Sequence, residues 1–149
     1  MRAKGATRLF VAGHSQGGLF AVHYAGQHKV DGVIAIAPVT DLALLKEESR
    51  FFTNFALSRD FIGSGPHIRE GSPAQNAEKI KAPVLMFHGD VDANVDVKES
   101  IFMKDKLTDA GKEVELVVYP KLDHYLEDSA VRTDMLKKSD AFLRASMGM

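Results

Sequence analysis

Short apolar runs alternate along the chain with segments whose apolar residues recur at helical spacing. The runs are nearly continuous rather than alternating with polar residues, which is typical of strands buried on both faces of a sheet. Strands are expected over residues 8–12, 32–37, 84–87 and 114–119, and helices over about 19–28, 97–110 and 131–143.

These elements follow the order β-α-β, then a long insert, then β-α-β-α. Strands separated by helices need crossover connections, so the sheet is expected to be largely parallel with helices on its faces. We predict one α/β domain over residues 1–149, a three-layer sandwich of about four mostly parallel strands. Ligands of such sheets bind at the carboxyl ends of the strands. Functional residues are therefore expected just after Ala12, Ala37, Phe87 and Tyr119.

The insert over residues 40–81 has two interpretations. It is either a lid-like segment that walls the substrate site, or a set of ordinary crossover helices whose phenylalanines belong to the core. We favour the core role for any single phenylalanine. Helices are expected to start at residues 40–41 and at residues 72–75, where S-P-A-Q matches a capping box with proline in the first turn. The phenylalanines concerned are Phe51, Phe52, Phe55 and Phe61.

The amino-acid composition excludes several classes of function. The chain of 149 residues has no cysteine, and its 19 basic and 20 acidic residues leave a net charge of −1. The lack of cysteine excludes a disulfide framework, a cysteine-based metal site and a thiol nucleophile. The balanced charge gives no electrostatic footprint for nucleic acid or an anionic membrane. No apolar run approaches the roughly 20 residues of a membrane span, and no signal-peptide stretch follows the start, so the default location is cytoplasmic.

The strongest chemical signal is G-H-S-Q-G-G at residues 13–18. It lies where a strand ends and a helix begins, the context of a nucleophile elbow, with Ser15 as the nucleophile. Glycines are expected on both sides of the serine because a Cβ there collides with a neighbouring element. The backbone N–H of Gln16 is then an oxyanion donor. A phosphate-binding turn is the alternative, but the lysine of a nucleotide loop is missing.

A serine nucleophile needs a histidine base and a carboxylate, which in this fold follow in the order serine, acid, histidine. The histidine must come last in the sequence. Of the six histidines, only His124 follows a predicted strand and lies C-terminal to the candidate acids. Three carboxylates compete in the loop after the third strand. We favour Asp92 as the acid because it falls in the middle of the loop, whereas Asp90 suits a turn and Asp96 a helix cap. Asp123, beside the histidine, is expected to be solvated.

The same loop, residues 88–96, faintly resembles a calcium-binding loop. It lacks the terminal glutamate at the right offset, so we expect no metal and no cofactor. Gly89 is expected to permit a sharp turn after the strand.

On these motifs the chain resembles the C-terminal part of a catalytic domain of the prolyl oligopeptidase and dipeptidyl-peptidase type, within the α/β-hydrolase superfamily. The resemblance implies Ser15 as nucleophile, Asp92 as acid, His124 as base and the Gln16 N–H as oxyanion donor. The matching stretches are residues 13–18, 80–95, 110–120 and 123–125, in the order found in the family.

The chain also departs from the family. The strands before the elbow strand, the loop that supplies a second oxyanion donor, and the β-propeller are missing. We therefore expect a truncated, minimal α/β-hydrolase fold, in which the strand over residues 8–12 would have one unpaired edge and the helices beside it would show apolar faces. We therefore expect a homo-oligomer, a dimer, that covers the edge of the first strand.

Two functions from different classes follow. The first is a serine hydrolase that cleaves small carboxylic esters, with aryl amides or short peptides as further substrates, through an acyl-enzyme. A thioesterase or lactone hydrolase stays open within that class. The second is a catalytically weak or inactive hydrolase fragment that acts as a dimeric binding or scaffold module. We favour the enzyme because the three triad candidates fall at three separate strand ends in the required order.

Overall fold

The computed structural model describes residues 4–149, and the strands among these residues form one sheet. Residues 1–3 of the predicted domain lie outside the described part. Each neighbouring pair of strands is parallel, which confirms the predicted α/β class. No helix in the described part is long and apolar enough to cross a membrane. In sheet order the strands are β1 (Phe10–His14), β2 (Gly32–Ile36), β3 (Val84–Gly89) and β4 (Val114–Tyr119).

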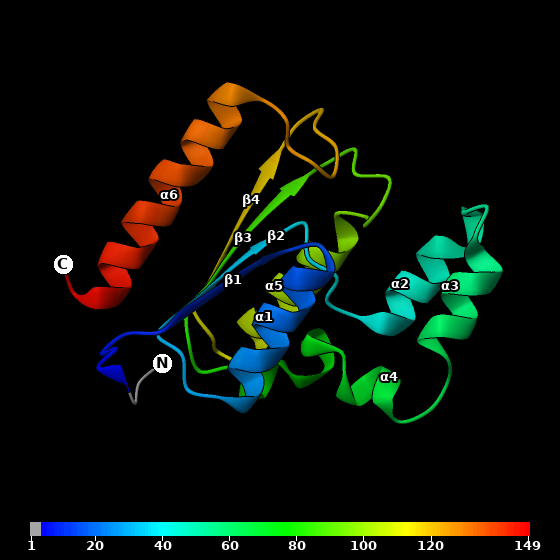
Figure 1. The fold of residues 1–149 in the computed structure, drawn as a ribbon, viewed down its shortest axis with the longest axis horizontal. Helices are drawn as coiled ribbons and strands as arrows, with labels where there is room; N and C mark the ends of the chain where they lie inside the picture. The colour runs from blue at the N-terminus through cyan, green and yellow to red at the C-terminus, as the bar shows by residue number, and fades with distance from the viewer. Residues whose placement is uncertain (1–3) are drawn as a thin grey trace.

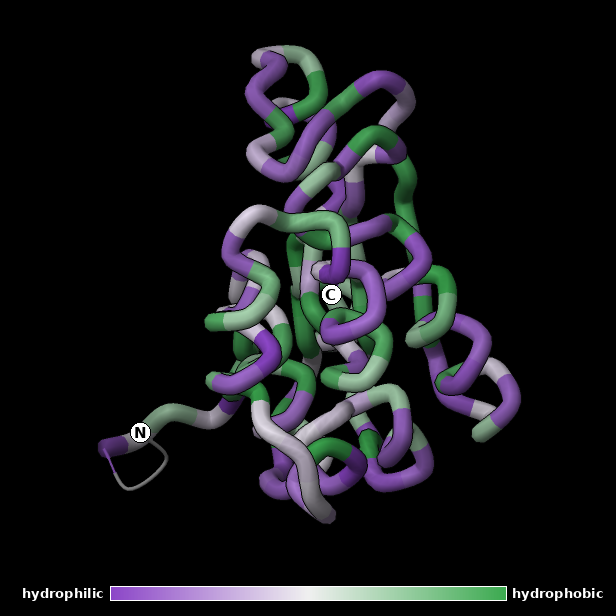
Figure 2. Tube along the Cα trace, turned by 90° about the vertical axis from the view of Figure 1, so that its right-hand side faces the viewer, coloured by the Kyte–Doolittle hydropathy of each residue, from purple (hydrophilic) through white to green (hydrophobic). Residues whose placement is uncertain are grey.

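Helices cover both faces of the sheet (Figure 1). Helices α1 (Gln16–Gln27) and α5 (Lys98–Asp109) pack on one face, where Val33 and Met86 belong to the core. Helix α6 (Ser129–Met147) packs on the other face, against Leu85 and Phe87. Figure 2 shows hydrophobic stretches running through the middle of the molecule. Because successive strand residues point to opposite faces, each central strand contributes side chains to the hydrophobic core on both sides of the sheet. The predicted three-layer arrangement is therefore confirmed.

Two strands end two residues later than predicted, because in both cases the sequence pattern treats a glycine as the stop. The first run was expected to end before Gly13, yet Gly13 and His14 pair with β2. The third run was expected to end at Phe87, yet β3 continues through Gly89, which pairs with β4. In each strand the glycine remains in the ladder.

The first helices of the insert lie beyond the carboxyl edge of the sheet (Figure 1), whereas its last helix, over residues 73–79, packs against α1 and α5. The predicted start near residues 40–41 is confirmed, because the Asp41 carboxylate caps the first helix by accepting hydrogen bonds from two backbone N–H groups. The favoured core role is wrong for Phe51 and Phe61, which are 89% and 86% exposed. The helices are α2 (Leu42–Glu48), η2 (Ser49–Phe51), α3 (Phe55–Ile62), α4 (His67–Glu70) and η3 (Pro73–Lys79), the η elements being 3₁₀ helices.

The predicted capping box at residues 72–75 is also wrong, although a helix does begin at Pro73. The Ser72 hydroxyl donates to the Ile68 carbonyl and accepts from the Leu42 N–H at 2.9 Å, so it does not cap η3. The Gln75 amide donates to the Asp41 carboxylate at 2.6 Å. Both side chains therefore join the far end of the insert to its beginning.

A buried glutamate on α5 anchors the start of the insert. Glu99 is fully buried, and its Oε2 accepts from the N–H groups of Thr40 and Asp41, each at 2.8 Å. Its other oxygen, and both buried carboxylate oxygens of Glu48 on α2, have no hydrogen-bond partner among the described residues. Burial raises the pKa of Glu99 to about 7, with the nearby Glu48 charge adding to the effect. Burial and the charge of Asp96 likewise raise the pKa of Glu48 to about 7.

These carboxyl groups predict how stability depends on pH. The folded chain holds protons that the unfolded chain releases near pH 4.5, so the free energy of unfolding falls as pH rises from 4.5 through about 7. Urea unfolding at pH 5, 6, 7 and 8 measures this slope. Glu99→Gln keeps an acceptor for the backbone donors and should flatten the slope. The exposed Glu47→Gln on the same helix as Glu48 is the control, and equal slopes in all three proteins would contradict the assignment.

Candidate active site

Ser15 occupies the tight turn between β1 and α1. Its φ of 59° lies in the left-handed region that residues with a side chain rarely adopt. The backbone holds it there, because its N–H donates to the Ile36 carbonyl at 2.8 Å and its own carbonyl accepts from the Gly18 N–H at 3.0 Å. The Ser15 side chain does not cap the helix. Its hydroxyl is therefore left available beside the N-terminus of α1, where negative charge is stabilised.

The glycines of the turn differ in what they allow. A Cβ at Gly13 would lie 2.0 Å from the Gly17 carbonyl oxygen, so the expected clash is confirmed there. At Gly17 a Cβ would meet nothing within 4 Å, and that half of the prediction is wrong. The second constrained glycine is Gly18, where a Cβ would lie 2.7 Å from the Cβ of Pro38. The helix is thus packed against both its own strand and the loop after β2.

Backbone strain concentrates at one edge of the sheet. Among the described residues, the non-glycine positions with positive φ are Ser15 after β1, Ala37 after β2, and Lys121 and Leu126 in the loop after β4. Each of them follows the carboxyl end of a strand. Such conformations persist where surrounding structure over-determines them, and they gather at functional sites.

Asp92 and His124 are brought together as the sequence predicts. The Asp92 Oδ2 lies 2.7 Å from His124 Nδ1, and both side chains are buried. A carboxylate accepts hydrogen bonds, so Nδ1 carries the proton and Nε2 keeps a free lone pair. The other oxygen of Asp92 accepts from the N–H groups of Asn94 and Val95 at 2.8 and 2.9 Å. Burial opposes ionisation, but hydrogen bonds from His88, Val95, His124 and Asn94 lower the pKa of Asp92 to about 2.

His88, a residue to which the sequence pattern assigns no function, also contacts the Asp92 carboxylate. Its Nε2 lies 2.9 Å from the Val95 carbonyl and 3.2 Å from Asp92 Oδ2. Its Nδ1 lies 2.7 Å from the Ser100 hydroxyl, which can donate to it. His88 therefore helps hold Asp92 in place. The available signal was a histidine inside a buried apolar run, four residues before the acid.

The loop after β3, which carries Asp92, is hydrogen-bonded to the loop after β4, which carries His124. Val91 N–H donates to the Leu122 carbonyl at 3.1 Å, and Asp90 Oδ1 accepts from the Lys121 N–H at 2.6 Å. A Cβ at Gly89 would lie 2.1 Å from the Leu122 carbonyl oxygen, so this glycine serves the close approach of two loops rather than a sharp turn. The Asp90 side chain thus joins two loops instead of capping its own turn.

The remaining carboxylates have local partners. Asp96 accepts at 2.9 Å from the N–H of Lys98, the first residue of α5, but the N-cap position itself is Val97, which makes no side-chain cap. Asp123 is exposed and accepts from the Tyr125 N–H at 3.0 Å, within its own turn. Neither side chain is hydrogen-bonded to His124.

His14 is a second histidine that sequence reasoning missed. Its Nε2 lies 2.8 Å from the His124 carbonyl oxygen, to which it can donate, and the two imidazole rings are 4.6 Å apart. Successive residues of a strand point to opposite faces of the sheet. His14 therefore points away from Ser15, toward the loop after β4. It ties the end of β1 to the segment that carries His124.

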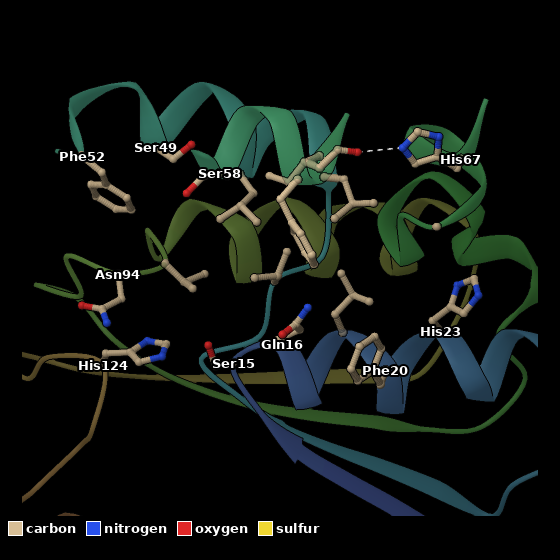
Figure 3. Close-up of a pocket in the computed structure, with 18 residues that line it drawn as sticks. Ser15, Gln16, Phe20, His23, Ser49, Phe52, Ser58, His67, Asn94 and His124 are labelled. Carbon is tan, nitrogen blue, oxygen red and sulfur yellow. Dashed lines mark hydrogen bonds between the residues drawn. The ribbon is translucent and has the colours of Figure 1, made fainter. Parts of the chain in front are cut away.

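Ser15, Gln16 and His124 line one cavity of about 610 Å³, between α1 and the insert (Figure 3). No hydrogen bond within residues 4–149 joins the Ser15 hydroxyl to His124, and catalytic hydrogen bonds are often long before substrate binds. The first N–H groups of α1, at Gln16 and Gly17, have no carbonyl of their own helix to bind. The cavity therefore presents a strained serine, an oriented imidazole and the first residue of α1, Gln16, whose backbone N–H has no partner within its helix.

Comparison with known proteins shows which family the chain matches. A model of the prolyl oligopeptidase family, Peptidase_S9, matches residues 4–149. The uncharacterized peptidase YtmA of Bacillus subtilis is 29% identical over 79% of this chain and 48% of its own length. The acylamino-acid-releasing enzyme of Mus musculus is 26% identical over 96% of this chain and 21% of its own length. The esterase EstD of Thermotoga maritima is 24% identical over 91% of this chain and 40% of its own length.

Solved structures share the fold. A puromycin-hydrolyzing peptidase of Mycobacterium tuberculosis superposes with a TM-score of 0.85 at 22% identity, over 95% of this chain and 22% of that one. A puromycin hydrolase gives a TM-score of 0.88 at 18% identity, over 99% of this chain and 23% of that one. This chain spans less than half the length of the curated relatives it matches here.

The two helical glycines of the turn offer a matched test of its packing. Gly17→Ala should stabilise the fold by about 0.5–1 kcal/mol, because alanine favours the helix and the space is open. Gly18→Ala should destabilise it, because the new Cβ lies 2.7 Å from Pro38 Cβ. Urea unfolding of both variants measures the difference, and equal effects of the same sign would contradict this packing.

Proposed function

The chain belongs to the prolyl oligopeptidase family, and on that premise we propose that it is a serine hydrolase of small carboxylic esters, with aryl amides and short peptides as further substrates. One observation carries the proposal: the strained Ser15 and the imidazole of His124, held by Asp92, line the same cavity. Relatives named as peptidases and as an esterase support hydrolysis as the reaction class.

In the proposed reaction, Ser15 Oγ attacks the acyl carbonyl while His124 Nε2 takes its proton. Asp92 keeps the Nδ1 proton in place and stabilises the imidazolium that forms. His124 then gives its proton to the leaving group, which departs and leaves an acyl group on Ser15. Water, activated by the same imidazole, attacks the acyl-enzyme, and the acid is released with Ser15 protonated again.

The negative charge that develops on the carbonyl oxygen needs donors in place before the reaction. The Gln16 N–H is the donor we propose, because it lies directly after the serine at the positive end of α1. Removal of one such donor typically lowers the rate by about 10²–10³-fold. With this one donor assigned, we expect modest turnover.

The alternative is a hydrolase-like module that binds without catalysis. It would keep the same fold and the Asp92–His124 pair, but Ser15 would not be unusually nucleophilic. Reactivity of that single hydroxyl therefore separates the two functions.

Intact-mass spectrometry after exposure to a fluorophosphonate measures this reactivity. We expect one adduct on the wild-type chain and none on Ser15→Ala, because only an activated serine reacts. Ser58, which lines the same cavity, provides the matched control, and Ser58→Ala should be labelled like wild type. A folded wild-type chain without an adduct would favour the binding module.

We also propose that a second copy of the chain covers the β1 edge, as the sequence analysis expects. Within residues 4–149, β1 is an edge strand of the sheet. Beside it lies an open hollow lined by β1 and α1, to which Phe20 and Tyr24, 60% and 41% exposed, contribute. An unpaired strand edge next to apolar surface favours association.

Light scattering at micromolar concentration tests the dimer. The wild-type chain should show twice the mass of one chain, and Tyr24→Lys should lower the mass toward that of a monomer by placing a charge in the hollow. Leu136→Lys, which changes a 73% exposed residue on α6, is the control and should stay dimeric. A monomeric wild-type chain would refute the proposal.

A further inference from the structure

The cavity extends from Ser15 along one face of α1. Gln16, Leu19, Phe20 and His23 line it, and their spacing of three and four residues places them on a single helix face. From Ser15 to His23 the helix rises by about 12 Å at roughly 1.5 Å per residue. Figure 3 shows Ser15 and His124 toward one end and His23 and His67 toward the other. We name this space the α1 trough.

The insert supplies the opposite wall of the α1 trough. Leu42 and Leu45 from α2, and Phe61 and Ile62 from α3, face the cavity. Phe61 is 86% exposed and lines the trough, whereas Phe51, 89% exposed in the same insert, does not line it. The wall is therefore apolar and includes an aromatic ring that solvent reaches.

Charged side chains are missing from this lining. Within the described residues, no aspartate, glutamate, lysine or arginine lines the cavity. Its polar side chains are serines, histidines, Gln16 and Asn94. A charged group that left water for this space would find no opposite charge, and an unpaired buried charge is strongly unfavourable. An uncharged apolar group instead gains from leaving water.

We propose that the α1 trough binds an extended, uncharged apolar group of the substrate, on one side of the scissile bond and roughly ten bonds long. The inference rests on the proposed function of Ser15 and deepens it. The chain then prefers esters with a medium-length alkyl or aryl-alkyl group over acetate esters. It also prefers them over peptides whose charged amino terminus would have to enter the trough.

Binding to the Ser15→Ala variant tests the trough without any need for catalysis. The probes are dansyl amides with an ethyl chain, a decyl chain, or a decyl chain that ends in an ammonium group, each used below its micellar concentration. The decyl probe should bind about tenfold or more tightly than the ethyl probe, because burial of methylene groups is favourable. The terminal ammonium should remove most of that gain.

Two phenylalanine variants, each made in the Ser15→Ala background, locate the binding site. Phe61→Ala should weaken decyl binding several-fold and leave ethyl binding nearly unchanged, because it removes part of the wall. Phe51→Ala is the matched control, and it should bind the decyl probe like the Ser15→Ala protein alone.

The inference fails if the ethyl and decyl probes bind equally, or if the two phenylalanine variants weaken decyl binding to the same extent. The proposed function is tested separately: the absence of a fluorophosphonate adduct on the wild-type chain would contradict it. Decyl-selective binding that depends on Phe61 supports the trough whatever the outcome of that labelling.

Discussion

All four strands run parallel, and this constraint places every loop that follows a strand at the same edge of the sheet. Residues far apart in the chain, Ser15, Asp92 and His124, therefore reach one end of the molecule. Gly13 and Gly89 bring backbones together at positions where a Cβ would lie within about 2 Å of a carbonyl oxygen.

The carboxylate of Asp92 is the centre of the site. Its two oxygens accept hydrogen bonds from two loop N–H groups and from His124, and His88 lies close by. Because these donors together outweigh the cost of burial, the carboxyl group keeps a low pKa and stays ionised. An ionised carboxylate held in place can fix one tautomer of the His124 imidazole, in which Nδ1 carries the proton and Nε2 can accept one. The strained turn of Ser15 places the other reactant in the same cavity.

The order of apolar runs predicts the sheet. The order serine, acid, histidine selects His124 as the base, and the middle of the loop selects Asp92 from three carboxylates, which the structure places beside that histidine. Local patterns were less reliable where tertiary contacts decide. Glycines in strands were interpreted as turns because sequence does not reveal which backbone lies opposite. The contact of His88 with the acid and the exposure of Phe61 depend in the same way on how the loops and the insert are placed.

In the proposed mechanism, Asp92 makes His124 an effective base for Ser15. The most direct measurement is the rate constant for phosphonylation of Ser15 by a fluorophosphonate in wild type and in Asp92→Asn at neutral pH. Our account predicts a fall of roughly 10³–10⁴-fold, because an amide neither holds the required tautomer nor stabilises the imidazolium. Equal rates in two folded proteins would show that the buried carboxylate does not activate the serine.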